Sequence, residues 1–195
     1  MNKITTSSWP FSSDHVHAWA YADAAFTPEE CNHIIKFGTI DPLNDSSIGN
    51  GNSNNGYRNS KVKWIFPCEE IDWVYKRLTD IITELNSNYF KFDLYGFNEG
   101  LQFTQYDAPA GHYDLHTDTA FEGQIRKLSV VIQLSDPLEY EGGNLELIKS
   151  KEPIILSKTQ GTVLLFPSYM AHQVTAVTKG RRYSLVSWIT GPNFR

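Results

Sequence analysis

Two stretches in the N-terminal half carry apolar residues at helical spacing. The first begins at Thr27-Pro28-Glu29-Glu30, a capping-box pattern with Thr27 as N-cap and Pro28 at the first helical position. A helix is predicted from here to about Phe37. The second stretch runs from Ile71 to about Asn88, with apolar positions at Val74, Leu78, Ile81, Ile82 and Leu85. Each pattern buries one stripe, so the N-terminal half predicts two amphipathic helices.

Polar segments precede and separate these helices. Residues from about Asn2 to His15 are rich in Ser and Thr, which predicts a poorly ordered arm or an edge segment. Asn44 to Ser60 is rich in Asn, Ser and Gly, and it predicts a mobile loop. We expect this loop to order over a substrate as a lid, with an ordinary disordered insertion as the alternative. Strand character returns at Lys61–Phe66.

From about Tyr95 the pattern changes to short apolar or alternating runs separated by Gly, Pro and Asp. These runs are Leu101–Tyr106, His112–His116, Lys127–Leu134, Asn144–Ile148, Thr162–Phe166, His172–Val177 and Arg182–Thr190. So many strands without intervening helices predict a closed or double-sheet antiparallel architecture, most simply a jelly roll. The chain is therefore expected to be a single α+β domain. Its helical flank and mobile loop fill residues 1–90 and pack outside a jelly-roll core at 91–195.

Composition narrows the class of protein. The chain has 195 residues, 41% hydrophobic and 20% charged, which suits one compact domain. The formal net charge of -5 gives no electrostatic reason to expect nucleic acid or an anionic membrane as partner. Two cysteines are too few for a disulfide framework or a thiolate zinc site. The first twenty residues carry no apolar run of signal-peptide or membrane-helix length, so a cytoplasmic protein is expected.

Candidate metal ligands lie in two of the predicted strands. His116 and Asp118 are two residues apart, and on a strand both side chains would point to one face. His172 begins a later strand. Two imidazoles and one carboxylate leave three positions open, which is the facial triad of non-haem Fe(II) oxygenases, whereas zinc more often keeps a tetrahedral site. His112 shares the predicted face of His116, but three ligands suffice, and we leave it out.

The open metal face requires an organic ligand to explain oxygen activation, and 2-oxoglutarate could chelate through its 1-carboxylate and 2-oxo group. Its distal carboxylate would then need a cation. Arg182 lies on a strand predicted to begin after a turn at Thr178-Lys179-Gly180, and a guanidinium binds a carboxylate bidentately. Alternation puts Ser184 on the face of Arg182, so its hydroxyl could add a bond, while Arg181 and Tyr183 point away.

These residues resemble the pattern of the 2-oxoglutarate and Fe(II)-dependent dioxygenase superfamily, in particular its prolyl 4-hydroxylase-like branch. Besides the four residues that carry the chemistry, the matching pieces are Phe26–Cys31, Arg58–Ser60 before Trp64, Leu101–Tyr106, Gly111, Tyr113, Tyr140–Leu145 and Ser187–Ile189. The resemblance implies a double-stranded β-helix core with iron near one mouth and Tyr106 lining the 2-oxoglutarate pocket. Some relatives place a tyrosine on the strand beside this pocket. Lys127–Leu134 offers none, so a second group for the distal carboxylate stays open.

The resemblance also implies a reaction. Hydroxylation of a C–H bond would be coupled to decarboxylation of 2-oxoglutarate to succinate, with ascorbate as reductant and a prolyl residue of a peptide or protein as the expected substrate. Three alternatives remain: a nucleic-acid or small-molecule oxygenase on the same core, a cupin-type metal enzyme, and a non-catalytic jelly-roll binding module. The net charge argues against nucleic acid, and a binding module would not need the four residues together.

Overall fold

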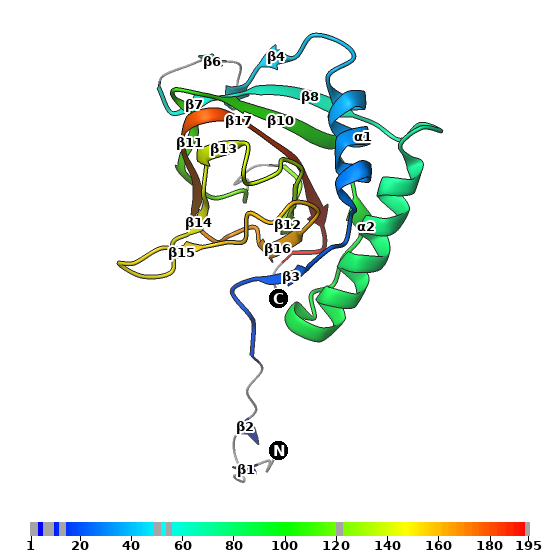
Figure 1. Ribbon diagram of the computed structural model, residues 1–195. Helices are drawn as coiled ribbons and strands as arrows, with labels where there is room; N and C mark the ends of the chain where they lie inside the picture. Colours follow the sequence, from blue (N-terminus) through cyan, green and yellow to red (C-terminus); the bar gives the residue numbers. More distant parts are fainter. Residues whose placement is uncertain are drawn as a thin grey trace.

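A computed structural model describes residues 4–5, 10–11, 15–48, 52–53, 56–119 and 123–193. Two α-helices, α1 (Pro28–Gly38) and α2 (Asp72–Leu85), lie on one side of the strands, and α2 continues into a single-turn π-helix, η1 (Asn86–Phe90) (Figure 1). The strands are β1 (Ile4–Thr5), β2 (Pro10–Phe11), β3 (Ala20–Ala22), β4 (Asn44–Asp45), β5 (Ser47–Ile48), β6 (Asn52–Ser53), β7 (Arg58–Asn59), β8 (Lys61–Ile65), β9 (Gly96–Phe97), β10 (Leu101–Asp107), β11 (Gly111–His116), β12 (Arg126–Gln133), β13 (Tyr140–Gly142), β14 (Leu145–Leu147), β15 (Ile154–Ile155), β16 (Val163–Pro167) and β17 (His172–Thr190).

Helix α1 begins at the predicted capping box. The backbone N–H of Glu30 donates to Thr27 Oγ1 at 3.2 Å, and the Thr27 N–H donates back to the Glu30 carboxylate at 2.9 Å. The same carboxylate accepts two hydrogen bonds from Arg77 on α2, at 2.6 and 2.8 Å. The start of the first helix is therefore tied to the middle of the second.

The strands form the predicted double-sheet antiparallel jelly roll. One layer runs β3-β16-β12-β17-β10-β8-β4, and β11, β13 and β14 pair with the other end of β17. The N-terminal half contributes more than a flank, because β3 and β8 extend this first layer. One apolar cluster fills the space between the helices and this layer, and a second fills the interior between the layers. One cavity lies at the second cluster, where polar side chains interrupt the apolar wall.

The predicted turn at Thr178-Lys179-Gly180 is wrong. His172 to Thr190 form one strand of 19 residues, which pairs with β11, β13 and β14 along its first part and with β10 and β12 along its second. Instead of reversing the chain, the glycine lets the strand pass from one layer to the other. Gly180 has φ +71° and pairs with Tyr140. A turn-like composition thus marks a bend within a strand.

The prediction of a loop from Asn44 to Ser60 is wrong at both ends of the segment. Asn44–Asp45 pairs with β8, and Arg58–Asn59 pairs with the strand that carries His116. Ser46 and Ser60 are buried and their hydroxyls are hydrogen-bonded to each other at 3.0 Å. The polar composition of the segment gave no sign of this pairing, because short edge strands need little apolar surface. The lid prediction falls partly on residues 49–51 and 54–55, outside the described residues, as does most of the predicted Asn2–His15 arm.

No helix among the residues that the structure describes is both long enough and apolar enough to cross a membrane.

The bend in β17 predicts that replacing Gly180 lowers the stability of the fold. A Cβ there would lie 2.1 Å from the Glu139 carbonyl oxygen, whereas a Cβ at Gly56, which also has positive φ, would meet nothing within 4 Å. We expect Gly56→Ala to cost about 1–2 kcal/mol for its left-handed backbone alone. Gly180→Ala should cost about 1–3 kcal/mol more, because the backbone must also shift. Urea unfolding of the two variants measures the difference, and equal losses would contradict a tight bend.

Candidate metal centre

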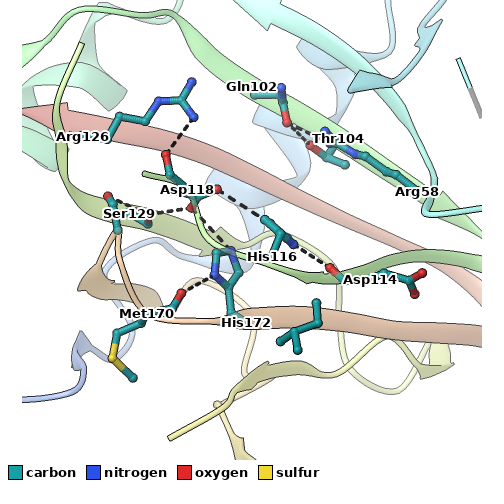
Figure 2. Close-up of polar contacts among 12 residues, drawn as sticks. Arg58, Gln102, Thr104, Asp114, His116, Asp118, Arg126, Ser129, Met170 and His172 are labelled. Atoms are coloured by element: carbon teal, nitrogen blue, oxygen red, sulfur yellow. Dashed lines mark hydrogen bonds and ion pairs between the residues drawn. The ribbon is translucent and has the colours of Figure 1, made fainter. Parts of the chain in front are cut away.

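His116, Asp118 and His172 converge on one point inside the jelly roll (Figure 2). One potential ligand atom from each lies within 4.8 Å of the other two. His116 Nε2 is 3.7 Å from Asp118 Oδ1, and His172 Nε2 is 3.4 Å from Asp118 Oδ2. Their side chains are only 9%, 9% and 6% exposed. Three buried donor atoms on one side of a common point form a cluster that could hold a metal ion.

The strands position the two histidines, while Asp118 is placed differently from the sequence expectation. His116 ends β11 and faces His172, the first residue of β17, across the antiparallel pair. Asp118 lies two residues beyond the end of β11, so strand alternation does not orient it. Its backbone N–H donates to the Ser168 carbonyl at 2.9 Å, and its Oδ2 accepts from the Ser129 hydroxyl at 2.6 Å.

Local carbonyl groups fix the tautomers of both histidines. His116 Nδ1 lies 2.6 Å from the carbonyl oxygen of Asp114, and His172 Nδ1 lies 2.9 Å from that of Met170. A carbonyl can only accept, so each Nδ1 carries the proton and each Nε2 keeps its lone pair toward the cluster. The partners are backbone carbonyl groups two residues upstream in both cases.

Protonation also favours a ligand role. Burial and the neighbouring His172 lower the pKa of His116 to about 4, so its imidazole is neutral at neutral pH. Burial acts to raise the pKa of Asp118, but the adjacent imidazoles and the Ser129 hydroxyl hold it below its ordinary value. Two imidazoles and one carboxylate, with the remaining directions facing a cavity, fit the chemistry of a non-haem Fe(II) centre.

The cavity beside the cluster contains the other residues singled out in the sequence. Arg182, Tyr106 and Ser184 line it together with the three potential ligands. Arg182 and Tyr106 are paired residues on β17 and β10. The outward residue Arg181 is instead exposed and forms an ion pair with Asp107. The bend at Gly180 therefore leaves Arg182 and Ser184 facing inward, although no turn precedes them.

Arg182 is a buried cation without a counter-ion. Only 1% of the residue is exposed, and no carboxylate forms an ion pair with it in the described part of the chain. Its Nη2 donates to Gln133 Oε1 at 2.9 Å, Nη1 lies 3.5 Å from Ser184 Oγ, and Nε has no partner. The pKa of Lys158 is lowered mainly by burial and further by the charge of Arg182. A buried charge of this kind is costly unless an anion compensates it.

Arg58 is a second such cation, and sequence reasoning treated it only as a motif residue. It is 8% exposed and lines the same cavity. Its Nη2 donates to Gln102 Oε1 at 2.9 Å and its Nε to Ser60 Oγ at 2.8 Å, while the guanidinium lies 4.5 Å from the centre of the Tyr113 ring. No alternation in the sequence showed that β7 pairs with the metal strand β11, so nothing placed Arg58 beside the cluster.

A glutamine on β12 orients the Arg182 guanidinium. Gln133 ends β12, and it both accepts from Arg182 and donates its Nε2 to the Ser157 carbonyl at 2.8 Å. Both amide atoms that could orient Arg182 or bind a ligand are therefore already engaged. Gln133 holds the guanidinium from behind, and the group that faces an incoming carboxylate is Arg182 itself.

Comparison with known families gives a match over residues 101–190 to the 2OG-Fe(II) oxygenase superfamily. Among curated proteins, a PKHD-type hydroxylase of Sphingopyxis alaskensis is 30% identical over 123 residues, covering 59% of this chain and 56% of its own length. Another PKHD-type hydroxylase, from Synechococcus, is 40% identical over 80 residues, covering 40% and 36%. The chain thus spans about half or less of the length of these relatives.

Solved structures share the fold. A prolyl-4-hydroxylase of Pseudomonas putida superposes with a TM-score of 0.70 at 19% identity, covering 91% of this chain and 94% of its own. A prolyl hydroxylase of Trichoplax adhaerens, in complex with a hypoxia inducible factor oxygen degradation domain peptide fragment, superposes with a TM-score of 0.75 at 17% identity, covering 89% and 84%. The sequence match over residues 101–190, the hydroxylase relatives and this shared fold together support a 2OG-Fe(II) oxygenase with a prolyl 4-hydroxylase-like fold.

Proposed function

We propose that this chain is an Fe(II)- and 2-oxoglutarate-dependent hydroxylase. His116, Asp118 and His172 would hold the metal, and Arg182 would bind the distal carboxylate of 2-oxoglutarate. The observation that carries the proposal is the uncompensated guanidinium of Arg182, buried in the same cavity as the three potential ligands. When bound, Fe(II) would supply oxygen activation coupled to the decarboxylation of 2-oxoglutarate to succinate and CO2.

The protein's own residues would bind and orient the reactants. The Arg182 guanidinium offers charge-assisted hydrogen bonds, the Ser184 hydroxyl can add one donor, and the Tyr106 ring, 5.4 Å from the guanidinium, walls the carboxylate in. The apolar lining excludes water from the reacting groups and comprises Val131, Leu145, Phe166, Val174 and Val186. The two carbonyl acceptors behind the imidazoles keep Nε2 of each unprotonated and aimed at the metal.

For the substrate we propose a prolyl residue within a peptide or protein. Support comes from the prolyl hydroxylases that share the fold, one of them solved with a peptide bound. It also comes from Arg58, because 2-oxoglutarate at Arg182 leaves this second guanidinium free for an acceptor on the substrate. A peptide carbonyl next to the target ring would supply that acceptor. The net charge of -5 disfavours a nucleic-acid substrate.

Removing any one ligand should abolish turnover. We expect His116→Ala, Asp118→Ala and His172→Ala each to lose Fe(II)-dependent succinate formation while retaining the fold. The control is His112→Ala, since the His112 ring nitrogens lie beside the Ala110 and Gly56 carbonyl oxygens and the Asp114 carboxylate, and His112 is outside the cluster. Succinate release is measured with and without added Fe(II), and circular dichroism checks the fold. Full turnover in any of the three variants would remove that residue from the proposed centre.

Removing Arg182 should weaken 2-oxoglutarate selectively. Losing a charge-assisted hydrogen bond costs about 1.5–3 kcal/mol, so Arg182→Ala should raise the KM for 2-oxoglutarate about ten- to a hundred-fold. Arg181→Ala removes the same charge from an exposed ion pair and should have little effect. Anaerobic protein with Fe(II) and 2-oxoglutarate should also develop a weak visible charge-transfer band, and Arg182→Ala should need more 2-oxoglutarate to reach it. Equal KM changes in the two variants would contradict the assignment.

A proline-containing peptide should gain one oxygen atom. The iron-loaded enzyme is incubated with 2-oxoglutarate, ascorbate and a peptide library, and mass spectrometry locates the added oxygen. We expect Arg58→Met to leave substrate-free decarboxylation of 2-oxoglutarate largely unchanged and to raise the KM for the peptide about ten-fold or more, as expected for a lost charged hydrogen bond. If free proline or another small molecule stimulates succinate formation while no peptide is oxidised, the peptide proposal is wrong and the iron chemistry stands.

A further inference from the structure

The three potential ligands differ in how they are held. The two histidines lie at strand ends, and each is hydrogen-bonded through Nδ1 to a backbone carbonyl. For His116 this carbonyl belongs to its own strand, and for His172 to the preceding turn. Asp118 lies outside any strand, and the hydrogen bond to its carboxylate comes from a neighbouring strand, β12. A carboxylate rotates broadly about its last torsion, so an unsupported Asp118 would sample several orientations.

A pair of buried serines supports that carboxylate. Figure 2 shows the one that contacts it, Ser129. Ser129 on β12 and Ser168, just after β16, are both fully buried, and their hydroxyl oxygens lie 3.0 Å apart. Ser129 Oγ is 2.6 Å from Asp118 Oδ2. Ser168 also accepts the Asp118 backbone N–H at its carbonyl, at 2.9 Å. The pair therefore holds both the main chain and the side chain of Asp118.

The proton directions in this chain of bonds follow from the chemistry of the groups. An ionised carboxylate can only accept, so Ser129 donates its one hydroxyl proton to Asp118. The Ser129 oxygen must then accept, which makes Ser168 the donor in the serine pair. Successive bonds in one direction polarise each other, so the bond to Asp118 is strengthened by the one behind it.

We propose that Ser129, backed by Ser168, is a positioning residue that holds the Asp118 carboxylate in the orientation needed to bind the metal together with His116 and His172. This inference rests on the proposed function. With one acceptor site of Oδ2 filled by the hydroxyl, the remaining lone pairs on the side of the imidazoles stay available. Arg126 Nη1 lies 3.5 Å from the Asp118 backbone carbonyl oxygen, so its hydrogen bond is to the main chain of Asp118.

A matched control separates positioning from mere filling of the interior. Ser187 lies on β17, which pairs with β12, and it is 1% exposed. Its hydroxyl has no hydrogen-bond partner. Ser187→Ala therefore removes the same atom from a buried position on the opposite face of the same layer without breaking a bond. Ser129→Ala instead breaks the bond to Asp118, and Ser168→Ala breaks the one behind it.

The test measures metal binding directly. The metal-free full chain is titrated with Co(II), an air-stable probe, by calorimetry and by visible d–d absorption. We expect Ser129→Ala to raise the Kd for Co(II) about ten- to a hundred-fold, as is typical for loss of a group that orients a ligand, and to change the absorption band. Ser168→Ala should show a smaller loss, and Ser187→Ala should bind and absorb like the wild-type protein.

The outcomes distinguish this inference from the proposed function. If the wild-type chain binds Co(II) no better than His172→Ala, the metal centre itself is wrong. If the wild-type chain binds but Ser129→Ala matches Ser187→Ala in Kd and spectrum, the centre stands and the positioning role is overturned. Circular dichroism of each metal-free variant precedes titration. Should Ser129→Ala fail to fold, Ser168→Ala decides: a loss absent from Ser187→Ala supports the role, and equal binding overturns it.

Discussion

The continuity of β17 is the constraint on which the rest of the site depends. One strand serves both layers, so it carries His172 into one layer and Arg182, Ser184 and Trp188 into the other. Strand alternation fixes which of these side chains face inward, and the bend at Gly180 fixes how far the metal cluster lies from the buried guanidinium. The spacing between a metal and an anion anchor is thereby set by main-chain hydrogen bonds, which are far stiffer than any side-chain arrangement.

The cavity contains more positive charge than its own residues compensate. In its described lining, two guanidinium groups face a single carboxylate. Each is hydrogen-bonded to neutral partners, Gln133 and Ser184 around Arg182, Gln102 and Ser60 around Arg58, which orient the cations without neutralising them. Folding therefore accepts an electrostatic cost that ligand binding relieves, and this relief favours anionic or strongly accepting ligands over neutral apolar ones.

Much of the fold could be predicted from the sequence, because it depends on local sequence patterns. The capping box at Thr27 and the alternation around Arg182 are signals of a few residues, and both appear in the structure as expected. What escaped prediction depends on pairing between distant segments. Gly180 looked like a turn because the sequence does not reveal that β13 pairs there, and Arg58 and Ser129 were passed over because their neighbours, β11 and Asp118, come from elsewhere in the chain.

The polar segment between β4 and β7 has one further consequence. Its ends are held by pairing with β8 and β11, so the metal strand is insulated from changes in the length of what lies between. The entropy of closing a loop grows only slowly with its length, by about 0.6 kcal/mol for each doubling. Insertions and deletions at this place are therefore thermodynamically inexpensive, and divergent descendants of such a chain can differ in length here while inheriting an unaltered reaction centre.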